Sequence, residues 1–206
     1  MPSAAQGQAM CLPKLKKGQD VRYAENLFLY SAAPVLRGVK PSVLFRVAGA
    51  YSSAFRERQE FLCRLSQLQI MELGKSPKSV LTLIYDEAEM ARALRDPLAV
   101  RILSEYGYMA ETNEVVSMLD HLRTRLLLQK FPHEIGLFLG YPSEDVRDFI
   151  ANSGKNCLLC RYWKVYHNIE RAQETFDRID EAKRYALHLL RRPLPVHTAV
   201  RMLQAM

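Results

Sequence analysis

The segment SVLTLIY, residues 79–85, constrains the fold of this chain more than any other stretch. It is a run of seven residues that is apolar at most positions and that ends in Tyr85 directly before an acidic residue. Apolar and polar side chains do not alternate along it, so the segment predicts a strand that is buried on both faces. We therefore expect it to lie in a sheet that other elements cover.

Helix signals follow this strand closely. Asp86 and Glu89 have the spacing of a capping box, Pro97 suits a first helical position, and Asn168 is placed to cap a long amphipathic helix. Asn113 is expected to cap another helix, and Ser143 to cap the one that begins there. The segments predicted as helices are 54–74, which Gly74 is expected to end, and 86–96, 97–107, 113–130, 132–140, 143–150 and 168–190.

Two further strands are expected. The apolar run Leu27–Tyr30 predicts a buried strand, and NCLLCRYWKVY, residues 156–166, predicts a loop that enters a strand. Between them Gly38 favours a turn, and Ser42 or the turn before it is expected to cap a short helix near Val43. Strands scattered among helices predict an α/β or α+β fold.

The length of 206 residues fits one domain. We expect this domain to span residues 23–190, with a small central sheet of about three or more strands and about seven helices. Residues 1–22 are expected to be a flexible lead-in, and residues 191–206 a proline-broken tail.

Charge and apolar patterning exclude several classes of protein. No run of eighteen apolar residues predicts a membrane span, and the N-terminus lacks the pattern of a secretory signal, so we expect a cytoplasmic protein that does not contact a membrane. Four cysteines in that compartment argue against a disulfide framework. The net charge of +7 comes from the two ends of the chain, and no nucleic-acid-binding module is present, which argues against a nucleic-acid partner.

Three blocks of the sequence resemble a bacterial family known as domain of unknown function 3793. They are HEIGLFLGYPSEDVRDFI (133–150) followed by CLLCRYWKVY (157–166), APVLRGVKPSVLF (33–45), and the strand LTLIY (81–85). The resemblance extends from about residue 26 to residue 176 and implies a protein found mostly in anaerobes. It supplies no activity and no catalytic residues. It also implies a cysteine just before the second block, where this chain has Ser31.

Cys157 and Cys160 are the residues most open to a chemical role. A Cys-x-x-Cys pair supplies half of a tetrahedral zinc or iron–sulfur site. His133 and His167 could complete it only if the tertiary structure brings them close. The Cys-x-x-Cys pair is also typical of a thiol redox couple. The third interpretation is that both are small buried side chains at the entrance to a strand.

Other polar residues of the same blocks are candidate site residues. His133 falls in the first turn of a predicted helix, whose positive end favours a neutral imidazole that can act as a base or a ligand, and Glu134 lies beside it. Lys40, after a turn glycine and before a predicted helix start, is placed to hold an anion. Tyr162 and Lys164 share one face of the predicted strand and would line a pocket beside Cys160.

These observations lead to one hypothesis and two alternatives. The hypothesis is a small-molecule site built from residues 31–42, the helix start at His133, and residues 157–164. Cys157 or Cys160 would be the reactive group and His133 the base. Anionic substrate would be bound by Ser31, Lys40, Ser42, Glu134, Tyr162 and Lys164. The alternatives are a transition-metal or iron–sulfur protein without catalysis, and an adaptor that binds a protein partner through its basic ends. The sequence leaves open whether the protein is an enzyme.

Overall fold

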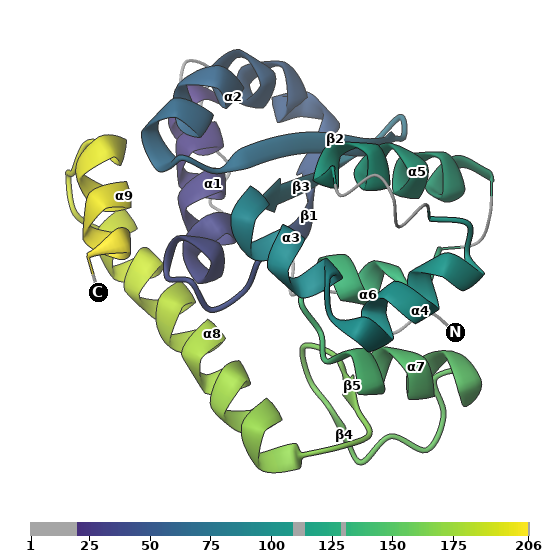
Figure 1. Ribbon diagram of the computed structural model, residues 1–206. Coiled ribbons are helices and arrows are strands. Elements are labelled where there is room, and N and C mark those ends of the chain that lie inside the picture. Colours follow the sequence, from purple (N-terminus) through teal and green to yellow (C-terminus); the bar gives the residue numbers. More distant parts are fainter. Residues whose placement is uncertain (1–19, 109–113, 129–130, 206) are drawn as a thin grey trace.

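The computed structural model describes residues 20–108, 114–128 and 131–205. Within these ranges a three-stranded antiparallel sheet in the order β1-β3-β2 lies among helices α1 to α9, and a separate two-stranded hairpin lies below it (Figure 1). The fold is therefore α+β, as the sequence predicts. None of the helices in the described ranges has both the length and the apolar character needed to cross a membrane.

The strand predicted from SVLTLIY is the centre of the sheet. It is β3 (Ser79–Tyr85), and it pairs with β1 (Ser42–Ala48) on one side and with β2 (Gln69–Lys75) on the other. Its side chains divide between two cores. Ile84 packs with α1, α2 and α9 on one face, whereas Leu83 and Tyr85 pack with α3 to α6 on the other. Burial on both faces is confirmed.

The first helix replaces a predicted strand. Residues 27–30 lie inside α1 (Asp20–Leu36), so the strand prediction for this run is wrong. Ala24, Phe28 and Ala32 recur every four residues and are completely buried, which is helical spacing. A short apolar run does not distinguish a buried strand from a buried helix, and here the longer pattern decides.

Two of the strands were not predicted. The prediction of a short helix near Val43 is wrong, because Val43 lies in β1 opposite Ile84. Helix α2 (Ser52–Ser66) ends at Gln67, which has a left-handed φ of 61°, and Gly74 lies in β2 and does not end a helix. Strand β1 pairs with β3 across more than 30 residues of the sequence, and no local pattern records this pairing.

Most of the predicted helices of the middle of the chain are confirmed. The one predicted for residues 132–140 begins only at Ile135, so Pro132 and His133 lie before it and not in its first turn. The Asp86 side chain accepts a hydrogen bond from Glu89 N at 3.0 Å, which begins α3 (Glu87–Leu94). The remaining helices of this region are α4 (Pro97–Glu105), α5 (Val115–Leu128), α6 (Ile135–Phe138) and α7 (Ser143–Ala151). The predicted cap of α7 is wrong, because Pro142 stands at the cap and Ser143 makes no capping bond. Asn113 lies outside the described residues.

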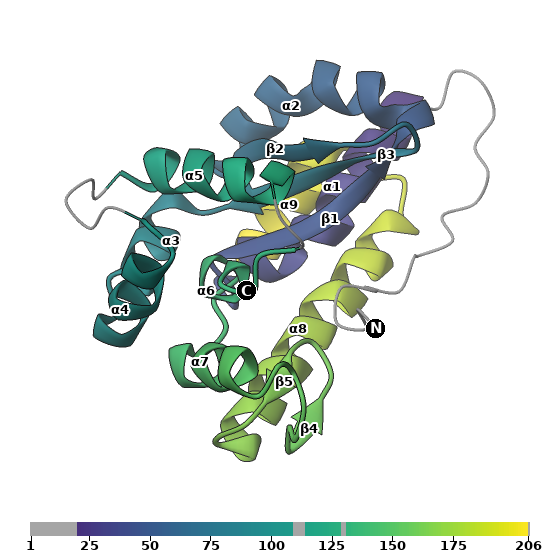
Figure 2. The same cartoon turned by 90° about the vertical axis from the view of Figure 1, so that its right-hand side faces the viewer.

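The C-terminal third lies against α1. The Asn168 side chain accepts a hydrogen bond from Arg171 N and begins α8 (Ile169–Leu190), which runs from the hairpin to α1 (Figure 2). The segment expected to be a proline-broken tail does break after α8. It then continues as α9 (Val196–Gln204), which buries Leu203 in the core beside α1 and α2.

Candidate functional site

The sequence blocks 33–45, 133–150 and 157–166 meet in space below the sheet. Gly140 has a φ of +69°, and a Cβ at this position would collide with the ring of Pro41. Ser42, next to that proline, is completely buried and donates a hydrogen bond from Oγ to Phe138 O at 2.7 Å. The loop before β1 is thus fixed against the loop after α6.

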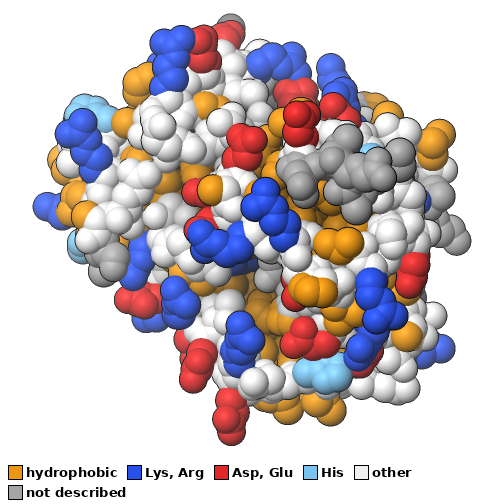
Figure 3. Space-filling model, viewed as in Figure 1, with side chains coloured by type: hydrophobic (Ala, Val, Ile, Leu, Met, Phe, Trp, Pro, Cys, Tyr) orange, Lys and Arg blue, Asp and Glu red, His pale blue; other side chains and the backbone are white. Residues whose placement is uncertain are grey.

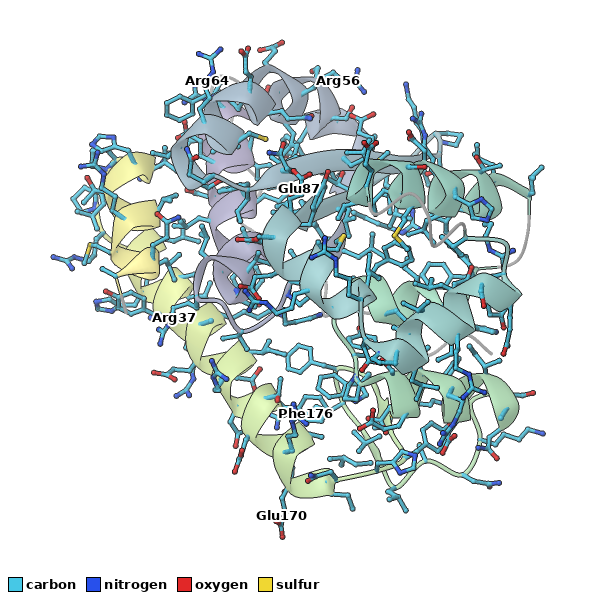
Figure 4. The ribbon with its side chains drawn as sticks, viewed as in Figure 1. Arg37, Arg56, Arg64, Glu87, Glu170 and Phe176 are labelled. Atoms are coloured by element: carbon cyan, nitrogen blue, oxygen red, sulfur yellow. The ribbon has the colours of Figure 1, made fainter. Side chains whose placement is uncertain are left out.

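Aromatic rings join these loops to the hairpin of β4 (Leu159–Cys160) and β5 (Lys164–Val165). The rings of Tyr141 and Trp163 stack with centroids 5.1 Å apart, and Tyr141 Oη donates to Tyr162 O at 3.2 Å. Phe176 points inward from α8 and meets Trp163 edge to face at 4.4 Å, whereas Glu170 at the start of the same helix points away from the molecule (Figure 4).

A buried carboxylate fixes the hairpin from below. Asp145 is 3% exposed, although it lies in the first turn of α7. Its Oδ2 accepts a hydrogen bond from Trp163 Nε1 at 2.8 Å, and its Oδ1 accepts from Tyr166 N at 2.8 Å and His167 N at 3.0 Å. Hydrogen bonds to a charged acceptor are strong, so Asp145 positions Trp163 and the residues before α8.

Lys40 lies at the centre of this meeting point. Its backbone N–H donates to Pro34 O at 3.2 Å, which fixes the turn at the end of α1. Its ammonium lies over the ring of Tyr141, with Nζ 4.9 Å from the centroid. Burial, together with repulsion from Lys183, lowers the pKa of Lys40 to about 7.

A second lysine, Lys183 of α8, faces the same region. Its Nζ lies 4.7 Å from the centroid of Tyr162 and 5.8 Å from that of Tyr30. Burial lowers the pKa of Lys183, whereas the carboxylate of Asp180 raises it. We refer to Lys40 and Lys183 as the lysine pair. Among the residues that the structure describes, no carboxylate forms an ion pair with either lysine.

The carboxylate that acts on Lys183, that of Asp180, is already engaged by other donors. Asp180 Oδ1 accepts a hydrogen bond from Tyr162 Oη, and its Oδ2 accepts one from Arg161. Burial and this hydrogen bond raise the pKa of Tyr162 well above its usual range. Asp180 therefore holds the hairpin against α8 and only partly offsets the charge of the lysine pair.

A cleft of about 320 Å³ lies beside this cluster. Val39, Gly140 and Trp163 line it, and these residues are the chain neighbours of Lys40, Tyr141 and Tyr162. Its wall carries charges of both signs, from Arg171 and Arg178 and from Glu144, Asp145 and Glu174. On the face shown in Figure 3, Lys and Arg side chains lie among acidic and apolar ones.

The structure does not bring the predicted cysteine and histidine residues together as a site. Cys157 is half-buried, Cys160 is exposed, and both are free thiols at the start of the hairpin. His133 is exposed and contacts Phe149, with ring centroids 5.1 Å apart. No group of three or more His, Cys, Asp or Glu side chains in the described ranges is arranged to hold a metal ion, so these three residues do not form such a group.

The other predicted site residues fall into separate environments. Glu134 is buried, where its Oε1 accepts hydrogen bonds from Arg125 and from Tyr108 Oη, the latter at 3.2 Å, in a network that includes α5. Lys164 donates from Nζ to Gly154 O, so it supports the loop before the hairpin. Ser31 is half-buried on α1, next to Tyr30. Of the predicted set, Lys40, Ser42 and Tyr162 lie at the meeting point.

Sequence reasoning missed Lys183, although a signal was present. Lys183 follows Ile179 by four residues and Phe176 by seven, so it lies on the apolar stripe of α8. A lysine on the apolar stripe of a helix is unusual, because burial removes the hydration of its charge and costs free energy.

Comparison of the whole sequence with models of protein families gives one match. A family model described as "Protein of unknown function (DUF3793)" matches residues 28–198, which is most of the chain. This chain is a member of the DUF3793 family. The DUF3793 match includes all the segments of this chain that form the meeting point, from the turn before Lys40 to Lys183 of α8. Comparisons with curated proteins and with solved structures give no match.

Proposed function

We propose that this protein binds a small anion between Lys40 and Lys183. The observation that carries the proposal is the lysine pair itself. Two half-buried ammonium groups interact closely enough for their repulsion to lower the pKa of Lys40, and no described carboxylate pairs with either. Unpaired buried charges are costly, and an anion bound between them would offset that cost.

The surroundings favour a small ligand that carries a carboxylate or phosphate group. The rings of Tyr30, Tyr141 and Tyr162 pack against the two ammonium groups and exclude water from them. In such a site an ion pair is much stronger than at the surface, because water screens it less.

The chain contains its own reporter for a binding test. Trp163 is the only tryptophan, and it stacks on Tyr141, over which Lys40 lies. We would titrate the protein with L-lactate and with inorganic phosphate at pH 6.5 and follow the Trp163 fluorescence. We expect saturable binding that Lys40→Met and Lys183→Met each weaken by at least about tenfold, the loss of roughly one charged hydrogen bond.

The matched control is Lys78→Met, because Lys78 is an exposed lysine in the turn between β2 and β3. This variant has the same change of net charge and is expected to bind as the wild type does. Equal affinity in all three variants would contradict the proposal, since binding would then depend on overall charge. Far-ultraviolet circular dichroism of each variant checks that the fold is retained.

A thiol-dependent reaction at Cys157 and Cys160 is the second candidate function. The observation that favours it is their position on the hairpin that carries Tyr162, with Cys160 exposed to reagents. The experiment is alkylation by iodoacetamide followed by mass mapping. We expect Cys160 to react before Cys63, whose thiol has its pKa raised mainly by burial. Equal or slower reaction of Cys160 would count against this candidate.

A further inference from the structure

We propose that the free edge of β1 binds an extended acidic segment of a partner protein, which joins the sheet as a further antiparallel strand. The sheet has the order β1-β3-β2, so β1 is an outer strand and one of its sides is unpaired (Figure 2). An unpaired edge offers a row of backbone donors and acceptors on which another strand can form. This surface is separate from the lysine pair and does not rest on the proposed function.

The hydrogen bonds at the two ends of β1 identify the backbone groups that point to the free edge. Before the strand begins, Asp86 N donates to Pro41 O at 2.9 Å. After it ends, Gly49 N donates to Lys78 O at 2.8 Å. Bonded and non-bonded pairs alternate in an antiparallel ladder, and the register is unbroken along β1, so its odd-numbered residues bond to β3. The even-numbered residues therefore turn their N–H and C=O groups outward: Ser42, Leu44, Arg46 and Ala48.

The free edge of β2, on the other side of the sheet, is protected in two ways. Its register shifts between Glu72 and Gly74, and such a bulge interrupts the regular row of groups that another strand needs. The Gln59 side chain of α2 also occupies this edge, since its Nε2 donates to Ile70 O at 2.9 Å. Strand β1 has neither device, because its seven residues pair with β3 in one register. Of the two edges, that of β1 is the one suited to accept a strand.

The open part of this edge runs from Leu44 to Ala48. At the other end, Ser42 is completely buried and bonded to Phe138 O, so α6 closes the edge there. Arg46 and Ala48 are exposed, and Leu44 is half-buried. Within the described residues, the outward backbone groups of these three have no hydrogen-bond partner. Each of them thus leaves one donor and one acceptor for an added strand.

The side chains around the open edge are basic and have no acidic partner. Arg46 donates to Ser79 Oγ at 3.3 Å, and no carboxylate of the described residues forms an ion pair with it. Residues 43–50 and 75–81 form this end of the sheet, and they contain Arg46, Lys75 and Lys78 but no Asp or Glu. Opposite charges on neighbouring strands stabilise a sheet, and like charges destabilise it. The edge therefore fits an acidic strand.

The two faces of the sheet differ at this edge. Val43 and Phe45 turn toward the core on the α1 side, whereas Leu44 and Arg46 turn toward the opposite face. Phe45 is half-buried, so an apolar side chain of an added strand would cover more of its ring. The segment that fits is therefore one in which acidic and apolar residues alternate. A second copy of β1 fits less well, because it brings another Arg46 and no carboxylate.

Fluorescence anisotropy with a synthetic peptide tests this inference on the full chain. The probe is a fluorescein-labelled peptide of about ten residues in which glutamate and valine alternate, which is longer than a usual strand. We expect saturable binding that Arg46→Glu weakens by at least about tenfold, because repulsion replaces attraction at the edge. The matched control is Arg101→Glu, which is expected to bind as the wild type does, since Arg101 is exposed on α4. Circular dichroism checks that both variants retain the fold.

Methylation of the peptide backbone separates strand addition from simple attraction of charge. In an antiparallel added strand, the residues opposite Leu44, Arg46 and Ala48 turn their N–H groups toward β1, and their side chains share the face of Arg46. Glutamates occupy these positions. Methylation of the glutamate nitrogens is therefore expected to weaken binding by at least about tenfold, because hydrogen bonds to β1 are lost. Methylation of the valine nitrogens should leave binding unchanged, although both peptides carry the same charge.

Three results would overturn the inference. The first is the absence of saturable binding by the unmodified peptide. The second is equal binding of the two methylated peptides, which would mean that charge alone attracts them. The third comes from sedimentation velocity: a dimer of the protein that the peptide dissociates would assign the edge of β1 to a second copy of the chain.

Discussion

The sheet core and the hairpin core of this protein bury different kinds of side chain. On the α1 face of the sheet, Phe28, Leu62 and Ile84 are completely buried and meet other aliphatic and aromatic groups. Around the hairpin the core is small, and Trp163 is placed there by a hydrogen bond to the buried Asp145. An apolar core is stabilised by the apolar surface area that it removes from water, whereas the hairpin core depends on a few hydrogen bonds of fixed direction.

This difference explains where the candidate site lies. A site needs polar groups in fixed positions that are shielded from water, and an apolar core supplies no such groups. The hairpin, α8 and the turn before β1 supply them because their own contacts are polar. The lysine pair is found at this junction, between the two cores.

The largest expected effect belongs to the sheet core. Phe28→Ala removes a completely buried ring and should lower the free energy of unfolding by about 4 kcal/mol. Urea unfolding followed by circular dichroism measures this change. Phe61→Ala is the matched control, because Phe61 is 39% exposed and should cost under about 1 kcal/mol. Similar losses in both variants would break the comparison.

Asp145→Ala is expected to act on the hairpin alone. It removes the acceptor of three hydrogen bonds and should cost about 3 kcal/mol. Trp163 fluorescence should shift to that of an exposed indole, while most of the helical circular dichroism persists. Glu144→Ala, at the neighbouring half-buried position, should leave the fluorescence unchanged. Joint loss of fluorescence and helix signal would show that the two cores unfold as one unit.

The stability contribution of Lys40 should depend on pH. The pKa of Lys40 is lowered on folding, so between about pH 7 and pH 10 the unfolded chain binds a proton that the folded chain does not. Stability from this group therefore rises with pH, by about 3 kcal/mol between pH 7 and pH 9.5. We expect Lys40→Met to lose this slope and Lys78→Met to keep it in urea unfolding at pH 7 and pH 9.5. Identical slopes in the two variants would refute the assignment.

The smallest effect is expected at the cysteine pair. Cys160 is exposed and Cys157 is half-buried, so replacing both by serine should change the free energy of unfolding by less than about 1 kcal/mol. The same urea experiment measures it, and anion binding by the lysine pair should be unaffected. A large loss of stability would mean that these thiols belong to the hairpin core and would favour the interpretation of both as buried structural residues.

Part of the fold could be predicted because its signals are local. The capping box at Asp86, the cap at Asn168 and the doubly buried strand 79–85 each depend on residues within a few positions, and all three are confirmed. The strand predicted at 27–30 was wrong because a short apolar run fits two structures. The partner strands β1 and β2 were missed because they are defined by pairing with β3.

For the candidate site, the sequence alone determined which blocks matter and that Lys40 and Tyr162 belong to them. It also determined family membership, since the residue types of those blocks follow no general folding pattern. Only the tertiary structure decided which of their side chains meet. It placed Lys183 opposite Lys40 and left Cys157, Cys160 and His133 without a shared metal-binding group. The physical reason is that the field around a charge depends on its neighbours in space, and Lys183 lies 143 residues after Lys40 in the sequence.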